Sequence, residues 1–184
     1  MQALAQRLQK IFSVPEWIYV QQAKLGDREA FGKLYQLYLD KIYRYVYFRV
    51  GQNKELAEDL ASDVFVKAWE KLGQYKEGSF QAWIYAIARN TVIDNYRTQK
   101  QHVALTETIA DEKQNHEEEI FKKLEIEKIK QALSKLTDEQ QEIITLKFIN
   151  DVPNTQIADI MGKREDAVRA LQSRAIKALQ EILV

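Results

Sequence analysis

The chain has 184 residues, with 27 Lys and Arg against 27 Asp and Glu, no Cys, and a hydrophobic fraction of 46%. This composition excludes collagen-like and wholly disordered proteins, and the lack of Cys excludes disulfides, iron–sulfur clusters and a cysteine nucleophile. Apolar runs such as Ile143-Ile144 fall far short of the ~18 residues of a membrane span, and the first ten residues have no signal-peptide core. We therefore expect a cytoplasmic protein without membrane insertion.

The net charge of zero hides an uneven distribution along the chain. Residues 1–100 carry a net charge of +4, residues 101–127 carry −5, and residues 128–184 carry +1. Only two aromatic residues, Phe121 and Phe148, lie beyond residue 100. An acidic stretch without a sustained apolar period gains too little from burial to offset its ordering entropy. Residues 101–124 are therefore expected to be a flexible acidic linker between a domain at 1–100 and a domain at 125–184.

Helical periodicity dominates the first 100 residues, and no alternating strand pattern is bounded by turn residues. A first helix is expected after the N-cap Asp27, with apolar residues at helical spacing from Phe31 onward and a stop at Gly51. A second helix is expected over about 54–72. A third is expected after the cap Ser79 and continues toward Tyr96.

The C-terminal part is also expected to be helical. A helix ending at Leu136 is followed by a capping box over 137–140 and a helix to Phe148. After a turn, Asn154 or Thr155 is expected to cap a short helix over 156–161, which Gly162 ends. A final helix is expected over 164–183. A short helix, a glycine turn and a longer basic helix form a helix-turn-helix, so the predicted fold class is all-α with two small domains.

Three groups of side chains indicate binding rather than catalysis. The basic side chains of the final helix suit base edges and phosphates, although a solvated face has the same pattern. The rings, amides and cations of residues 80–97 suit stacking of unpaired bases, although each ring alone is more often core. Glu58, Asp59 and Asp63 form either a solvated face or an acidic patch for a basic partner, and the spacing does not decide between them.

No cofactor and no metal ion are expected. His102 and His116 are the only His residues, and two His in an acidic linker are a weak case for a metal site. No nucleophile–His–carboxylate pattern or glycine-rich phosphate loop is present, so an enzyme is not expected.

Four motifs, in this order, resemble the group IV, extracytoplasmic-function sigma factors of bacterial RNA polymerase. LGDREAF at 25–31 is similar to the opening helix of the family's sigma-two domain, and AEDLASDVFVKAW at 57–69 is similar to its polymerase-binding helix. FQAWIYAIARN at 80–90, continued through Asp94 and Arg97, resembles the segment that melts and reads the −10 element. QIADIMG at 156–162 with VRALQSRA at 168–175 resembles the sigma-four helix-turn-helix.

The resemblance implies a transcription initiation factor with a sigma-two domain at 1–100 and a sigma-four domain at 125–184. Its implied partners are core RNA polymerase (clamp helices and flap), promoter DNA and an anti-sigma factor. The implied polymerase-binding residues are Glu58, Asp59, Asp63, Phe65 and Trp69. The implied −10 contacts are Tyr75, Lys76, Trp83, Arg89, Asn90, Asp94 and Arg97. The implied −35 contacts are Arg164, Arg169, Ser173, Arg174 and Lys177.

The sequence departs from the family pattern in three places. Residues 163–166 offer no Ser or Thr cap for the recognition helix, and Leu171 stands where a basic residue is common. Residues 1–16, with Leu4, Leu8 and Ile11 at helical spacing, form a longer N-terminal extension than many members have. Two alternatives remain beside the resemblance, a conventional helix-turn-helix repressor or activator with a ligand-sensing N-terminal half and, less favoured, an all-helical enzyme.

Overall fold

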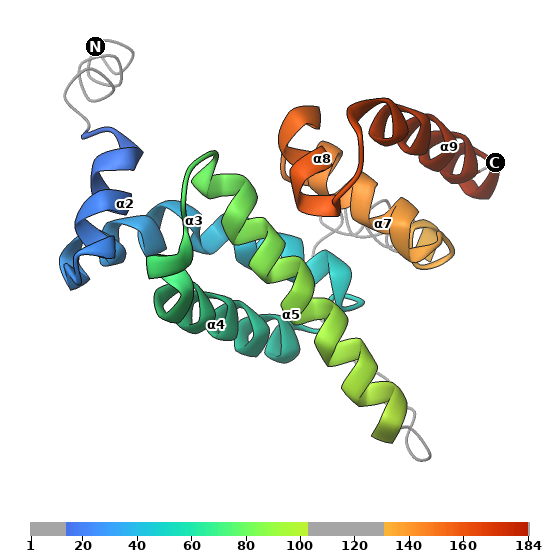
Figure 1. Cartoon of the computed structure of the whole chain (residues 1–184). Coiled ribbons are helices and arrows are strands. Elements are labelled where there is room, and N and C mark those ends of the chain that lie inside the picture. The colour runs from blue at the N-terminus through green and yellow to red at the C-terminus, as the bar shows by residue number, and fades with distance from the viewer. Residues whose placement is uncertain (1–13, 103–130, 184) are drawn as a thin grey trace, which may run out of the picture.

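The structure is a computed structural model that describes residues 14–102 and 131–183, and every regular element within these ranges is a helix (Figure 1). The expected all-α fold class is thereby confirmed for the described residues. None of the helices in these ranges is both long and apolar enough to cross a membrane. Residues 1–13 of the N-terminal extension and residues 103–124 of the predicted linker lie outside the described residues. The expected start of the linker at residue 101 was wrong by two residues, since residues 101 and 102 are helical.

Four α-helices form the N-terminal unit: α2 (Glu16–Lys24), α3 (Arg28–Arg49), α4 (Lys54–Lys71) and α5 (Phe80–His102). A short 3₁₀ turn, η1 (Leu72–Gln74), follows α4. Helix α3 packs against α2, α4 and α5, and α4 packs against α5. Apolar residues from three of these helices meet in one core, among them Ile42, Val64 and Ile84.

The predicted helix boundaries of this unit are confirmed by their capping bonds. The Asp27 side chain accepts hydrogen bonds from the backbone N–H groups of Glu29 and Ala30, and the Ser79 hydroxyl accepts one from Ala82 N. Helix α3 stops just before Gly51, which has a φ of 64°.

The C-terminal unit contains α7 (Asp138–Ile144), the π-helical turn η2 (Thr145–Ile149), α8 (Asn154–Met161) and α9 (Glu165–Leu183). The predicted capping box is present: Gln140 N donates to the Thr137 hydroxyl, while Thr137 N donates to the Gln140 side chain. Gly162 ends α8 in the left-handed region, with a φ of 62°. The core of this unit is small, and its buried apolar residues include Ile157, Ile160, Val168, Leu171 and Ala175.

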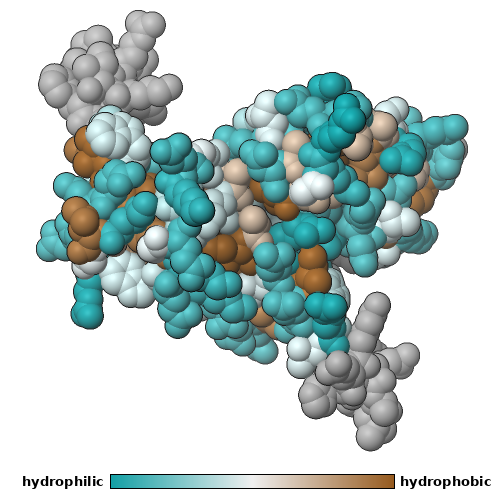
Figure 2. All heavy atoms as spheres, viewed as in Figure 1, coloured by the Kyte–Doolittle hydropathy of each residue, from teal (hydrophilic) through white to brown (hydrophobic). Residues whose placement is uncertain are grey.

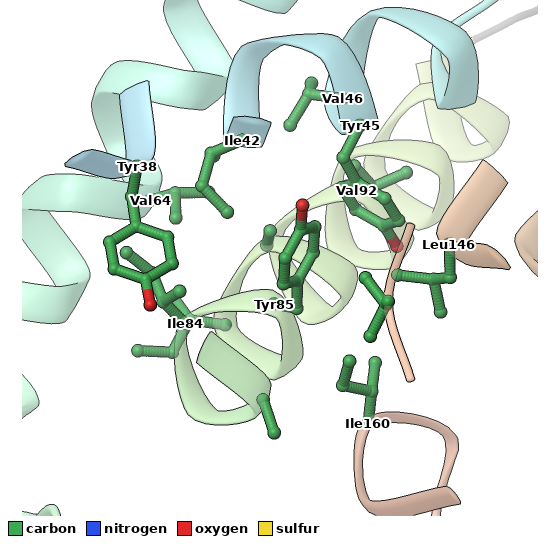
Figure 3. Close-up of a cluster of buried hydrophobic side chains, with 14 of the residues drawn as sticks. Tyr38, Ile42, Tyr45, Val46, Val64, Ile84, Tyr85, Val92, Leu146 and Ile160 are labelled. Carbon is green, nitrogen blue, oxygen red and sulfur yellow. The ribbon is translucent and has the colours of Figure 1, made fainter. Parts of the chain in front are cut away.

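The two units pack directly on one another. Helix α5 contacts α8, and α3 contacts η2, so α5 lies between α4 and the C-terminal helices (Figure 1). Tyr45 and Tyr85 of the first unit belong to the same buried cluster as Leu146 and Ile160 of the second (Figure 3). All four are buried, so the hydrophobic core continues from one unit into the other.

Several local expectations were wrong. Helix α2 was not expected, although Pro15 directly before it is a typical helix start. The helix expected to run to Phe148 changes to a π-helical turn at Thr145. Neither Asn154 nor Thr155 caps α8: Pro153 occupies the N-cap position, and the Asn154 side chain binds Gln172 instead.

Candidate functional sites

An acidic surface lies on α4, where Glu58, Asp59 and Asp63 are exposed. The two aromatic residues predicted beside them have a different placement. Phe65 is 4% exposed, and its ring packs 4.6 Å from that of Tyr35; Trp69 is half-buried, 5.0 Å from the ring of Phe31. The carboxylates can therefore meet a basic partner directly, whereas the rings hold α4 against α3.

The segment before α5 is built on aromatic packing. Tyr75 is buried, and its hydroxyl donates to the Gly78 carbonyl over 2.7 Å. Its ring lies 5.3 Å from the ring of Trp83, which is half-buried, and 5.8 Å from that of Phe80. For Tyr75 and Phe80 the structure favours the core interpretation of the ring-rich stretch over base stacking. Lys76, which follows Tyr75 in the loop before α5, is exposed.

One face of α5 offers polar side chains to solvent. Asn90, Asp94 and Arg97 follow each other at intervals of four and three residues and are all exposed. Arg89 is adjacent but occupied: its side chain is 27% exposed, and its Nε lies 3.7 Å from the Glu142 carboxylate of α7. The structure thus divides the predicted −10 residues into an exposed row and one arginine held by the C-terminal unit.

Helices α8 and α9 form the predicted helix-turn-helix. Their relative placement is fixed by the buried residues Ile157, Val168 and Leu171, and by a reciprocal pair of amide hydrogen bonds between Asn154 and Gln172 of 2.8 and 3.2 Å. Helix α9 starts at Glu165, directly after a segment that offers no Ser or Thr as a cap. Arg164 therefore precedes the helix, and its carbonyl accepts a hydrogen bond from Val168 N.

The cations of the helix-turn-helix are exposed but partly neutralised. Arg164, Arg169, Ser173, Arg174 and Lys177 all lie at the surface. Arg164 pairs with Asp166 over 3.4 Å, Arg169 with Glu165 over 3.3 Å, and Lys177 with Glu181 over 4.0 Å. Exposed pairs of this kind are weak, so a phosphate can replace the carboxylates.

A buried ionic cluster between the two units was not predicted. Glu142 of α7 is 3% exposed and accepts a hydrogen bond of 2.5 Å from the Tyr45 hydroxyl. Arg49 Nη2 lies 3.5 Å from its other oxygen. The only sequence signal is a Glu directly before the apolar run from Ile143, and a surface Glu on an amphipathic helix looks the same.

The protonation of this cluster follows from its surroundings. Burial raises the pKa of the Tyr45 hydroxyl well above its usual value, and the adjacent Glu142 charge raises it further. Burial, the largest single effect, lowers the pKa of Arg49, but the charges of Glu142 and of the neighbouring Tyr45, Tyr96 and Asp138 together raise it overall. Arg49 is therefore a cation and Tyr45 a neutral hydrogen-bond donor at neutral pH.

The described residues do not bring three His, Asp or Glu side chains together in a way that could hold a metal ion. On the face displayed in Figure 2, hydrophilic side chains cover most of both units.

Comparison with known proteins identifies both units. The family model for Sigma-70 region 2 matches residues 34–102, and the model for Sigma-70, region 4 matches residues 126–179. The chain is 35% identical over 170 residues to the ECF RNA polymerase sigma factor BldN of Streptomyces coelicolor. This match covers 89% of this chain but only 64% of BldN. It is 30% identical to the ECF RNA polymerase sigma factor SigW of Bacillus subtilis, over 89% of this chain and 94% of SigW.

Two solved structures resemble the fold. CnrH in complex with the cytosolic domain of CnrY matches with a TM-score of 0.72 at 24% identity, over 90% of this chain and 95% of CnrH. The sigma factor RpoE of Bartonella quintana, solved with the anti-sigma factor NepR, matches with a TM-score of 0.69 at 26% identity, over 83% of this chain and 96% of that protein.

Proposed function

The chain belongs to the extracytoplasmic-function sigma factors, which direct RNA polymerase to promoters and are not enzymes, and from this premise we propose how its surfaces divide that task. The acidic surface of α4 binds polymerase, the exposed face of α5 reads the opened −10 element, and α9 reads the −35 element. The protein acts in the cytoplasm, where RNA polymerase and the chromosome are located. The ligand-sensing repressor and the helical enzyme are not supported, because neither accounts for a region 2 unit.

The polymerase contact is assigned to Glu58, Asp59 and Asp63. These carboxylates are exposed on one helix of the region 2 unit, and a cluster of one sign suits the basic clamp helices of the polymerase. Phe65 and Trp69 contribute indirectly, by fixing α4 against α3. The polymerase flap is assigned to the C-terminal unit without a choice of residues.

The −10 contact is assigned to the exposed row Asn90, Asp94 and Arg97, together with Lys76 and Arg89. Melted DNA exposes base edges and faces, so amide and guanidinium groups can hydrogen-bond bases and hold the backbone of a single strand. Tyr75 and Trp83 pack together and shape the loop before α5, and Trp83, which is half-buried, stays partly accessible to a base.

The −35 contact is assigned to α9, the second helix of the helix-turn-helix. The early turns of such a helix enter the major groove. Arg169 and Ser173 lie one turn apart there, followed by Arg174 and Lys177, and Arg164 precedes the helix where it can reach phosphate.

An anti-sigma factor is proposed as the regulatory partner. RpoE of Bartonella quintana, with which this chain shares 26% identity, was solved with the anti-sigma factor NepR. The acidic linker at 103–124 remains a sequence-based prediction.

The observation that carries this proposal is the order of the two units: a region 2 helix with exposed carboxylates precedes a region 4 helix-turn-helix with exposed cations. The test is the double variant Asp59→Ala with Asp63→Ala. Removal of two like charges at i, i+4 relieves a repulsion of about 0.2–0.5 kcal/mol in the helix, so the variant remains folded. We expect its affinity for bacterial core polymerase to fall at least tenfold.

The control is Asp40→Ala, which removes an exposed carboxylate from α3 of the same unit and leaves the affinity unchanged. Affinity is measured by titration of labelled sigma factor with core polymerase, and specific initiation by transcription of a genomic fragment library. Equal affinity of wild type and double variant would contradict the assignment of α4. Absence of both holoenzyme and specific transcripts with the wild type would contradict the proposed function itself.

A further inference from the structure

The seam between the two units contains a charged group that neither unit needs for its own fold. Glu142 belongs to α7, but its side-chain partners all come from the other unit: Tyr45 and Arg49 of α3, and Arg89 of α5. Around it, Tyr85 and Val92 meet Leu146 and Ile160 in an apolar contact (Figure 3). A carboxylate is desolvated here only because the units are closed, and closure is the state in which its charge is compensated.

The compensation is incomplete in a way that favours release. The Nε atoms of Arg49 and Arg89 are buried without a hydrogen-bond partner among the described residues, and the contacts of the two guanidinium groups with Glu142 are 3.5 and 3.7 Å long. A cavity of about 280 Å³ beside them admits solvent to the cluster. A closed state with satisfied charges but unsatisfied donors is held less firmly than a fully bonded core.

The same contact covers a proposed DNA-binding residue. Arg89 is held by Glu142, and Arg97 lines the same cavity as Asp138 and Glu139 at the start of α7. The Glu142 carboxylate thus occupies the position that a nucleic-acid phosphate would take at Arg89. Full access of a single strand to the half-buried Arg89 therefore requires that α7 withdraws.

The covalent chain permits such a withdrawal. Twenty-eight residues, 103–130, join the end of α5 to the first described residue of the C-terminal part. A chain of that length spans up to about 95 Å when fully extended. The units therefore stay together through their contacts at the seam and not through a short tether.

We propose that Glu142 is an intramolecular latch, which holds the C-terminal unit closed over Arg89 and keeps the sigma factor from nucleic acid until the units separate. The latch itself follows from the geometry of the seam. Its competition with DNA for Arg89 rests on the proposed function, so the two are measured separately.

The latch is tested by the distance between the units in the full chain. The chain has no Cys, so Glu70→Cys and Gln180→Cys, both at exposed positions, introduce one spin label on each unit without background. We expect one narrow distance for the wild type. Glu142→Gln leaves the buried Arg49 and the half-buried Arg89 without this counter-charge, so we expect at least a tenfold shift toward a longer, broad distribution. Tyr45→Phe removes one hydrogen bond without a change of charge, and a several-fold shift is expected.

The matched control is Glu139→Gln, on the same helix, because Glu139 pairs with Lys163 within its own unit. Its distance distribution should equal that of the wild type. Circular dichroism checks helix content; should Glu142→Gln unfold, Tyr45→Phe decides. A long distance in the wild type, or wild-type distances in both folded seam variants, would overturn the latch.

The second measurement is the affinity for a single-stranded oligodeoxynucleotide. Glu142→Gln and Glu139→Gln change the net charge equally, so only uncovering of Arg89 distinguishes them. We expect at least a fivefold gain for Glu142→Gln over Glu139→Gln. Longer distances without this gain would sustain the latch and contradict the assignment of Arg89 to DNA, whereas equal gains together with unchanged distances would overturn the latch.

Discussion

Among single residues, Gly162 has the most restrictive backbone conformation in the helix-turn-helix. Its φ of 62° lies in the left-handed region, and the following Lys163 N–H donates to the Ala158 carbonyl to close the end of α8. An added Cβ would meet no atom within 4 Å, so only backbone strain opposes a side chain there. We expect Gly162→Ala to lower the free energy of unfolding by about 1 kcal/mol, measured by urea denaturation.

Gly73 provides the matched control. It also has open space around its Cβ position, but it does not require a positive φ. Gly73→Ala should be neutral or stabilise by up to about 1 kcal/mol, because Ala restricts the unfolded chain. Equal losses in both variants would mean that volume, and not backbone conformation, decides at Gly162.

Residue patterns predicted the location of charged side chains better than that of rings. The exposure of Asp59, Asp63 and Asn90 agrees with their placement on polar helix faces. Tyr75 has the residue type of a base-stacking platform, yet it is buried because Lys24, Phe80 and Trp83 pack around it. A ring fits a core and a binding surface equally well, and only tertiary neighbours decide between them.

Between elements, the angle of α8 and α9 depends on a polar contact as well as on apolar packing. Asn154 and Gln172 exchange two amide hydrogen bonds across the helix-turn-helix. In a double-mutant cycle of Asn154→Ala and Gln172→Ala, we expect a coupling energy of about 0.5–1.5 kcal/mol in the free energy of unfolding. The variants should also lose specific transcription more than polymerase binding, because α9 changes its orientation while α4 is untouched. A coupling energy near zero would contradict the role of the pair.

Local chemistry explains which elements were predictable. The caps at Asp27, Ser79 and Thr137 were identified because each cap bonds within three residues of itself. The cap of α8 was missed because Asn154 finds a partner 18 residues away instead. The π-helical turn at Thr145–Ile149 lies where the chain packs against α3, and helical periodicity carries no information about such a contact.

At the scale of the whole molecule, positive and negative charges balance in number, and some of them also pair locally. Three of the cations assigned to the −35 element, Arg164 directly before α9 and Arg169 and Lys177 within it, pair with acidic residues of α9. Affinity for duplex DNA grows with the number of phosphates neutralised. We therefore expect the free chain to bind promoter duplex with a dissociation constant that is micromolar or higher at ~0.15 M salt. Fluorescence anisotropy measures this, and nanomolar binding by the free chain would contradict it.

The contact between the units was beyond prediction from the sequence. The helices of each unit can be recognised from local sequence patterns. The burial of Glu142, however, depends on Tyr45 and Arg49, almost 100 residues away along the chain. A Glu on an amphipathic helix gives no sign of such a partner.

Buried tyrosines make the closed molecule sensitive to alkali. Burial raises the pKa of the Tyr38, Tyr45 and Tyr85 hydroxyls above the usual value in the folded state, and Glu16 raises that of Tyr38 further. The unfolded chain releases these protons near pH 10, while the folded chain retains them. Unfolding therefore releases protons above pH 10, and the free energy of unfolding falls as the pH rises, by at most about 1.4 kcal/mol per tyrosine and pH unit.

Stability should be independent of tyrosine ionisation below about pH 9 and fall steeply above pH 10. Urea denaturation at successive pH values measures the fall, and ultraviolet difference absorbance measures tyrosinate formation. We expect the buried tyrosines to ionise together with the loss of helix, because unfolding is what exposes them. Tyr45→Phe should reduce the slope by up to about one proton, since it removes one titrating group from the core. Tyrosinate formation by all nine tyrosines near pH 10 with unchanged helix content would contradict the burial of these hydroxyls and, with it, the closed packing of the two units.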